Sequence, residues 1–362
     1  MEQTKNRHNF LVIFLVALVA VTWTLPKVSF AVEVKPVVLK FAEDEPAGSM
    51  YAKTREWWAR EIERRTGGRL QVKIYPGGTL ANARNAIDAV MTKVADGGTV
   101  VSVFHPGKTP LATVSQNPVG SSDLYASYEA MKYLLDNYAP LQKEFAKFNQ
   151  KAFWAYASGG QKLIATRPIE NLSKLKGLKV RATAQMGSLA DKLGAIPVFI
   201  PMGETYEGLQ RGTAEGAMAG LAHMKPLRFY EVCKHLLMLE GIGGSNCGFG
   251  TINLDVWKSL PPDIQKTVSE VSNEYYTFAA KAHIEMEQTI LNEFKAAGVT
   301  VYSLSADDKN KLTAAGEEVT RLWTKDLDGK GLPGSEILDT LLKVTAKYHA
   351  EGETKGYPWK RK

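Results

Sequence analysis

The residue of this chain with the clearest chemical potential is Arg181, the last residue of the run Lys-Gly-Leu-Lys-Val-Arg at 176–181. The short alternation of apolar and basic side chains predicts a β-strand that ends at this arginine. Loops gather into clefts at strand ends, and a guanidinium there presents a planar fork of donors that fits a carboxylate. The pattern favours binding of an organic acid; an ordinary ion pair at a strand end is the alternative.

Motifs of known catalytic sites are absent from the sequence. It contains neither the G-x-S-x-G elbow of serine hydrolases nor the H-E-x-x-H pair of zinc proteases. A Gly-Lys-Thr run at 107–109 resembles the end of a phosphate-binding loop, but Ser102 stands where that loop needs its first glycine, which indicates a plain turn. Glu204 and Glu215 could be paired acid/base carboxylates. We expect a protein that is not an enzyme, and an exported hydrolase is the alternative class.

The two cysteines, Cys233 and Cys247, leave two structures open. They are either buried free thiols or partners in one disulfide between a helix and the following strand. Neither cysteine belongs to a C-x-x-C pair, and the six histidines form no H-x-x-x-H pattern. We therefore expect no metal site and no cofactor.

The first 31 residues have the organisation of an export signal. Lys5 and Arg7 precede an apolar run over 10–21, and Ser29-Phe30-Ala31 has the small-x-small pattern of a cleavage site. The apolar run is shorter than the roughly 18 residues that a membrane span needs. We expect cleavage near Ala31 and an exported product.

Length and composition indicate a globular protein of two lobes. The chain of 362 residues is 44% hydrophobic and 23% charged, which is ordinary for folded proteins. Without residues 1–31, it carries 42 basic and 37 acidic side chains, a net charge of +5. This mild excess is spread along the sequence, apart from the basic residues 360–362, so we expect no binding to nucleic acid.

The predicted elements alternate between strands and helices, which is typical of the α/β class. In the first half, strands are predicted at 37–42, 70–75 and 99–104 and helices at 49–65 and 82–93. In the second half, strands are predicted at 153–156, 163–166, 178–181 and 196–200 and helices at 186–193 and 204–211. The segment 262–297 has helical apolar spacing and no proline or glycine after its start, so it predicts one helix long enough to cross both lobes.

Several separated motifs resemble the DctP-type solute-binding proteins of tripartite ATP-independent periplasmic (TRAP) transporters. The most specific is E-x-Y-x-x-L-Q-x-G-x-x-E-G at 204–216, which is followed by F-Y-E-V at 229–232. Supporting motifs are R-T-G-G at 65–68, I-x-N-L-x-x-L-K-G at 169–177 and L-P at 260–261. The resemblance extends from about residue 37 to about residue 305, and the motifs stand in the family's order. A binding protein of an ATP-driven importer has a similar two-lobe design and is a further alternative.

The resemblance implies a two-lobe periplasmic binding protein with a strand hinge, a long helix spanning both lobes and a ligand enclosed between them. Residues 32–158 plus about 247–285 would form lobe I, and 159–246 plus about 286–362 lobe II. The family's carboxylate-binding arginine falls on Arg181. The expected location is the periplasm, and the expected partners are a small organic acid and the subunits of a TRAP membrane permease.

Two positions depart from the sialic-acid and dicarboxylate binders of that family. Gln161 stands where those proteins commonly have a second basic residue, and Ala219 stands where they have an asparagine. One fixed positive charge and a less polar wall indicate a monocarboxylate, with room for an apolar or aromatic body.

Four further residues are weaker candidates for the ligand site. Glu43 and Asp44 follow the first predicted strand, and a carboxylate that reaches the cleft would accept a hydrogen bond from a hydroxyl or ammonium group of the ligand. Phe104 ends a later strand, and Trp154 lies just before the crossing between the lobes. Aromatic residues of this kind more often pack in the core.

Overall fold

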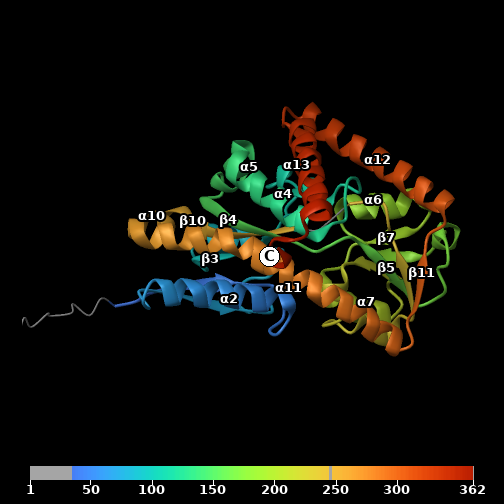
Figure 1. The fold of residues 1–362 in the computed structure, drawn as a ribbon, viewed down its shortest axis with the longest axis horizontal. Helices are drawn as coiled ribbons and strands as arrows, with labels where there is room; N and C mark the ends of the chain where they lie inside the picture. Colours follow the sequence, from blue (N-terminus) through green and yellow to red (C-terminus); the bar gives the residue numbers. More distant parts are fainter. Residues whose placement is uncertain (1–34, 244–246, 362) are drawn as a thin grey trace, which may run out of the picture. The chain divides into compact units, whose positions relative to one another are not determined.

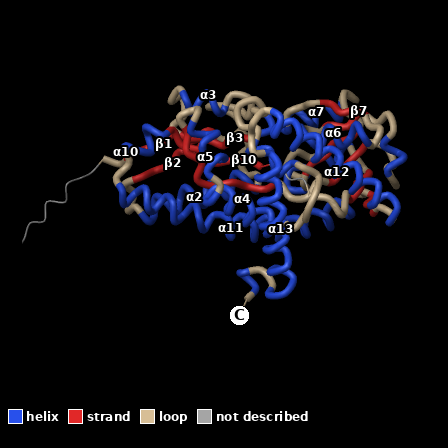
Figure 2. Tube along the Cα trace, turned by 90° about the horizontal axis from the view of Figure 1, so that it is seen from above, coloured by secondary structure: helices blue, strands red, loops and turns tan. Residues whose placement is uncertain are grey.

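In the computed structural model of the chain, which describes residues 35–243 and 247–361, the strands form two separate sheets (Figure 1). The expected signal peptide at 1–31 lies outside the described residues. Figure 2 shows the two groups of strands from a perpendicular direction, with helices around each group. The predicted α/β class is therefore confirmed.

The first sheet has five strands in the order β2-β1-β3-β10-β4. Its central strand β3 pairs in parallel with β1 on one side and antiparallel with β10 on the other. The strand bounds are β1 Val37–Ala42, β2 Leu70–Tyr75, β3 Gly97–Val101, β4 Gln150–Ala157 and β10 Cys247–Asn253. Because β1 and β3 are parallel, the loops after both strands emerge at the same edge of the sheet.

The second sheet has six strands in the order β11-β9-β5-β8-β6-β7. β6 pairs in parallel with both β7 and β8, while β5 is antiparallel to β8 and β9. The strand bounds are β5 Lys162–Ala165, β6 Lys179–Arg181, β7 Ile196–Val198, β8 Gly216–Ala219, β9 His235–Met238 and β11 Thr300–Ser303.

The long helix α11, Pro262–Ala296, connects the two sheets, as predicted. Val271 and Tyr275 in its first half belong to the hydrophobic core beside the first sheet, whereas Ile290 and Phe294 near its end belong to a core beside the second sheet. Figure 1 shows α11 running from the region of β10 to that of β11. The chain itself leaves the first sheet after β4, builds the second sheet from β5 to β9 and returns as β10.

The remaining helices cover the sheets. Their bounds are α2 Met50–Arg65, α3 Ala86–Met91, α4 Leu124–Asn137, α5 Ala139–Ala146, α6 Ala184–Lys192, α7 Thr205–Gln210, α8 Leu221–Met224, α9 Phe229–Val232, α10 Leu254–Ser259, α12 Ala306–Gly329 and α13 Gly334–Lys355. Ser49 begins α2 as predicted, because its Oγ accepts a hydrogen bond from the backbone N–H of Ala52 at 3.1 Å.

Two of the element boundaries that differ from the sequence-based prediction have a local cause. The helix expected over 82–93 is only α3, because the side chains of Asn82 and Asn85 accept hydrogen bonds from backbone N–H groups of residues 84 and 82 and so stabilise a turn there. The strand expected over 99–104 ends at Val101, where the chain enters a turn of 3₁₀-helix, Ser102–Phe104.

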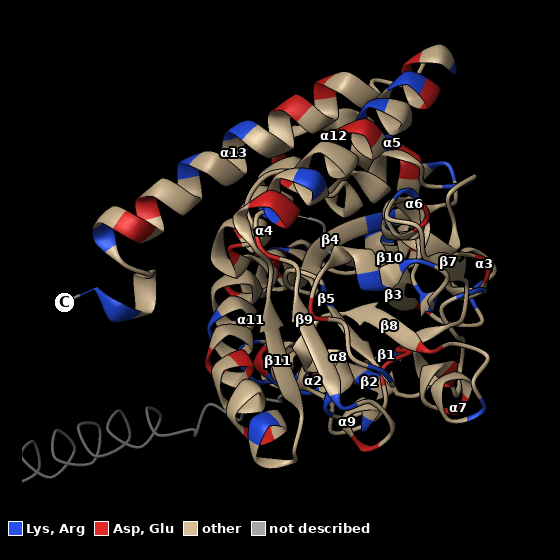
Figure 3. Ribbon diagram, turned by 90° about the vertical axis from the view of Figure 1, so that its right-hand side faces the viewer, with Lys and Arg blue, Asp and Glu red and all other residues tan. Residues whose placement is uncertain are grey.

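The C-terminal helix α13 packs against α4, beside the first sheet. Ile337 and Leu338 of α13 are buried in the same hydrophobic core as Tyr128 of α4. Residues 334–355 therefore contact elements of the expected lobe I, although the expected boundaries placed them in lobe II, because their apolar side chains find their core there. Figure 3 shows α13 passing α4 and extending toward the C-terminus.

Candidate functional site

A cavity of about 250 Å³ is lined by residues from the ends of strands in both sheets. Asp44 follows β1, and Val101 and Phe104 lie at the end of β3 and just beyond it. Arg181 ends β6 in the second sheet. The carboxyl ends of parallel strands commonly hold ligands in α/β proteins, because loops diverge there and leave a crevice. This cavity is the candidate site.

Arg181 is held in the cavity wall by backbone groups rather than by an acid. Its side chain is only 2% exposed. Nε donates to the carbonyl of Ile200 at 2.9 Å, and one terminal nitrogen donates to the carbonyl of Met218 at 3.3 Å. Burial alone lowers the pKa of Arg181 to about 10, and no described carboxylate opposes this shift. The guanidinium is therefore rigidly placed and has donors left for an anion.

The two acidic candidates after β1 have different surroundings. Glu43 is fully buried, lies 3.0 Å from Nε of Arg55 and accepts a hydrogen bond from the hydroxyl of Thr99 at 2.7 Å. It does not line the cavity, so its contacts are those of a structural residue. Asp44 does line the cavity, and its Oδ1 is buried without a hydrogen-bond partner.

Phe104 lines the cavity and contacts an aromatic residue from the other sheet. Its ring centroid lies 5.6 Å from that of Phe199, which follows β7 and is 50% exposed. The guanidinium of Arg84 lies 5.8 Å from the centre of the Phe199 ring. These three side chains form a contact between residues of the two sheets beside the cavity.

The other three candidates lie elsewhere. Trp154 is completely buried in the core of the first sheet and stacks on Tyr275 with a centroid distance of 4.9 Å. Gln161 is 3% exposed, and its side-chain amide donates to the hydroxyl of Ser158 at 3.4 Å. Ala219 ends β8, is 1% exposed and packs in a core beside the second sheet. None of the three lines the described cavity.

Several residues that the sequence did not single out do line the cavity. Tyr156 lies two positions after Trp154 in β4, so strand alternation places both side chains on the same face. Only Tyr156 lines the cavity, and alternation could not have distinguished it from Trp154. Glu45 and His223 meet across the cavity wall, with Oε1 and Nε2 2.9 Å apart. Among the described lining residues, Arg181 is the only arginine or lysine. The apolar part of the wall comes from residues such as Val103, Met202 and Leu227.

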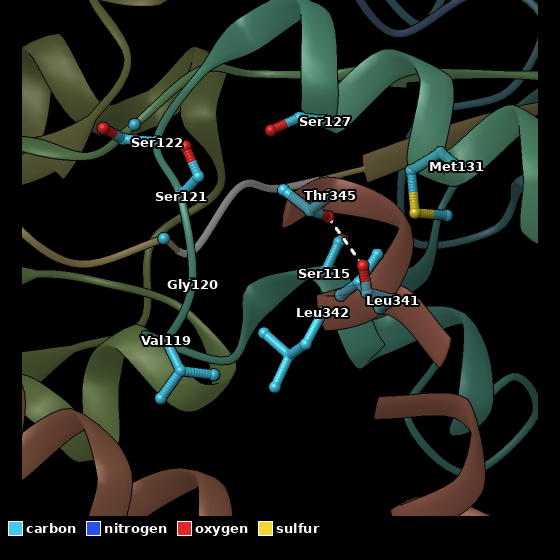
Figure 4. Close-up of a pocket in the computed structure, with 12 residues that line it drawn as sticks. Ser115, Val119, Gly120, Ser121, Ser122, Ser127, Met131, Leu341, Leu342 and Thr345 are labelled. Atoms are coloured by element: carbon cyan, nitrogen blue, oxygen red, sulfur yellow. Dashed lines mark hydrogen bonds between the residues drawn. The ribbon is translucent and has the colours of Figure 1, made fainter. Parts of the chain in front are cut away.

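A second cavity, shown in Figure 4, is too small for an organic acid. Its volume is about 30 Å³, which is room for about one water molecule. It is lined by Val119–Ser122, by α4 and by α13, where the hydroxyl of Thr345 donates to the carbonyl of Leu341 at 2.7 Å.

Two features of the described residues bear on other functions. Over residues 35–243 and 247–361, no group of three or more histidines, cysteines or acids is arranged to hold a metal ion. In the same part of the chain, every helix is too short or too polar to cross a bilayer.

Comparison with known proteins places the sequence in one family. The profile of the family described as bacterial extracellular solute-binding protein, family 7, matches residues 41–326. The C4-dicarboxylate-binding periplasmic protein DctP of Rhodobacter capsulatus is 26% identical over 321 residues, which are 84% of this chain and 90% of that protein. A monocarboxylate 2-oxoacid-binding periplasmic protein of Nostoc is 27% identical over 283 residues, covering 74% and 71%.

Solved structures agree with the two-sheet fold. A TRAP periplasmic solute-binding protein of Desulfovibrio salexigens, crystallised as an open complex, is 29% identical and superposes with a TM-score of 0.77. The match covers 88% of this chain and 98% of that protein.

Proposed function

The chain belongs to the bacterial extracellular solute-binding proteins of family 7, and from this premise we propose that it binds a small monocarboxylic acid between its two sheets and delivers it to a TRAP-type membrane permease. The observation that carries the proposal is Arg181, a buried guanidinium that lines the cavity and has no acid partner among the described residues. Burying an unpaired cation is costly, and an anionic ligand offsets that cost.

The charges in the cavity wall favour a ligand with one carboxylate over a ligand with two. Arg181 is its single described arginine or lysine, and Lys162, the next basic residue along the chain from Gln161, lies 2.9 Å from Glu287 in an ion pair. A second ligand carboxylate would be removed from water without a cation. Relatives bind both kinds of acid, since one is named for C4-dicarboxylates and another for monocarboxylate 2-oxoacids, so the wall of this cavity is what favours the monocarboxylate.

The other proposed parts of the function follow from the family. Export to the periplasm through the signal at 1–31 agrees with the periplasmic relatives, and the partner would be the permease of the same transporter. The two lobes would close over the ligand about the segment between β4 and β5. Catalysis by Glu204 and Glu215 as a pair has no support. Glu204 lines the cavity but Glu215 does not, and Oε2 of Glu215 accepts the backbone N–H of Lys179 at 3.1 Å. The relatives named above are binding proteins.

A thermal-shift screen of small acids, followed by titration calorimetry of the hits, tests the proposal, since a ligand that binds the folded state raises the unfolding temperature, and a tighter ligand raises it more at equal concentration. We expect hits among monocarboxylates. Tight binding of succinate or malate without a response to any monocarboxylate would contradict the single-carboxylate part. No response to any acid, together with no acid detected by native mass spectrometry of freshly purified protein, would contradict the proposal as a whole.

A further inference from the structure

Three carboxylates follow β1 in succession, and two of them have a basic neighbour. Glu43 lies 3.0 Å from the guanidinium of Arg55. Glu45 lies 2.9 Å from the imidazole of His223, and this contact lowers the pKa of Glu45 against the effect of its burial. Among the described ion pairs, none includes Asp44, which stands between them.

Among these three carboxylates, Asp44 is the one with a buried oxygen that lacks a hydrogen-bond partner in the described part of the chain. It lines the cavity, and the oxygen without a partner is Oδ1. Burial, then the charges of Glu43 and Glu45 and a hydrogen bond with Glu43, raise the pKa of Asp44 well above its usual range. A buried carboxyl oxygen without a donor is costly, and a cation beside it would both complete its hydrogen bonding and offset the neighbouring negative charge.

Independent groups in the same cavity also lack partners. Arg181, which is 2% exposed, has no acid partner among the residues that the structure describes. His223, which is 4% exposed, lines the cavity with a buried Nδ1 that makes no hydrogen bond. Arg181 and Asp44 belong to the same cavity wall but form no ion pair with each other among the described contacts. The lining residues also include Glu45 and Glu204. Among the described contacts, Arg181 is the cation without an acid partner, and Asp44 is the carboxyl group with an unpartnered oxygen.

We propose that the ligand carries a protonated amine besides its carboxylate, and that Asp44 binds the amine while Arg181 binds the carboxylate. The inference rests on the proposed function and narrows it to amino-substituted monocarboxylic acids. The ammonium donates to Oδ1 of Asp44, and its positive charge stabilises the ionised form of that carboxyl group. His223 also lines the cavity, and its Nδ1 is available for a further polar group of the ligand.

The alternatives at the Asp44 end are less favourable for physical reasons. A second carboxylate would lie close to both Asp44 and Glu45, which repel it. An alkyl or unsubstituted aryl group would exclude water from Asp44 Oδ1 and supply no hydrogen bond. A hydroxyl donates a hydrogen bond but brings no charge, so it should rank between the two.

Titration calorimetry with matched acids tests the inference. The panel pairs pentanoate with 5-aminopentanoate, 3-phenylpropanoate with phenylalanine, and 4-methylbenzoate with 4-(aminomethyl)benzoate; 5-hydroxypentanoate and glutarate complete the aliphatic series. We expect the amine of at least one pair to bind about tenfold or more tightly than its partner, from the strength of a charge-assisted hydrogen bond. Glutarate should bind more weakly than pentanoate.

The variant Asp44→Asn connects any preference to this residue. Asparagine keeps the size of the side chain and removes its charge, so the advantage of the amine should fall to about threefold or less, as expected for a neutral hydrogen bond. Asp339→Asn, an exposed position on α13, is the matched control and should keep the full preference. Thermal unfolding of each variant without ligand checks that it folds. If Asp44→Asn does not fold, the comparison of the paired acids in the wild-type protein still tests the inference.

The outcomes separate this inference from the proposed function. If amine and amine-free acids bind equally, or the amine-free acids bind more tightly, the inference is wrong and carboxylate binding stands. If the preference survives in Asp44→Asn, the assignment to Asp44 is wrong. If no acid of any kind binds, the proposed function fails and the inference fails with it.

Discussion

At the scale of single residues, the account depends on how Arg181 is buried. Its guanidinium is fixed by two backbone carbonyls and faces no acid, and its desolvation lowers its pKa to about 10. A structural arginine at a strand end would instead be paired, as Arg55 is with Glu43. The lack of an acid partner is what distinguishes a ligand-binding arginine from the ion pair that the sequence also allowed.

Replacing Arg181 with lysine should weaken binding of the carboxylate by about tenfold to a hundredfold, because an ammonium keeps the charge but loses the two parallel hydrogen bonds. Titration calorimetry with the best acid of the screen measures this loss. Arg211→Lys, at the exposed end of α7, is the control and should bind normally. Unchanged affinity in a folded Arg181→Lys variant would assign the arginine a purely structural role.

Cys233 gives a test of burial at a second residue. It is a buried free cysteine, and desolvation raises its pKa to about 12. Because the thiolate is the reactive form, iodoacetamide at pH 8 should modify Cys233 slowly in the native protein and rapidly in denaturant without reductant. Peptide mass spectrometry follows both. Rapid native modification would contradict the burial, whereas protection that persists in denaturant until a reductant is added would indicate the disulfide alternative.

The sequence predicted some members of the site and not others, for a reason visible in the strands. Three of the predicted residues that line the cavity lie at the end of a strand or just after one, where loops form the edge of a cleft. They are Arg181, Asp44 and Phe104. Trp154 and Ala219 lie within strands whose described residues are buried on both faces around them. When both faces of a strand are buried, the pattern of apolar and polar residues cannot show which face lines the cavity. Whether Trp154, Gln161 and Ala219 contact the ligand stays a prediction.

At the scale of elements, the packing of β4 against β10 is tight around one glycine. A Cβ atom at Gly250 would lie 2.1 Å from Cε2 of Trp154, and that ring is backed by Tyr275. A side chain at this position would force the Trp154 ring or the strand pair to shift, so glycine is strongly favoured there.

Gly250→Ala should lower the free energy of unfolding by about 1–3 kcal/mol, the usual cost of overpacking a core. Gly107→Ala is the matched control, because a Cβ there meets no atom within 4 Å, and it should be nearly neutral. Urea unfolding of both variants measures the difference. Equal stability of the two would show that β4 and β10 are packed more loosely than the structure describes.

Helices with clear end signals were predicted well, and those with competing side-chain bonds were not. α2 begins after Ser49, and α11 has the predicted length because proline and glycine are absent from its interior. α3 is short because Asn82 and Asn85 bond to nearby backbone instead. α12 and α13 carry no recognised motif. The packing of α12 against α6 and of α13 against α4 depends on long-range contacts that periodicity does not encode.

At the scale of the whole molecule, a ligand enclosed by residues of both sheets should shift an equilibrium between open and closed lobes. Small-angle scattering of the signal-free protein is expected to give a smaller radius of gyration at saturating ligand than without it. The contact between Phe104 and Phe199 spans both sheets beside the cavity, so Phe199→Ala should leave the ligand-free protein more open. An unchanged radius on ligand binding would contradict closure about the hinge.

A crystal structure of the protein with the tightest-binding acid would show directly whether Arg181 binds the ligand. We expect the ligand in the cavity between the sheets, with both carboxylate oxygens within hydrogen-bonding distance of the Arg181 guanidinium, which keeps its bonds to the carbonyls of Ile200 and Met218. A ligand whose carboxylate is bound by another basic residue, with Arg181 making no contact to it, would contradict the account.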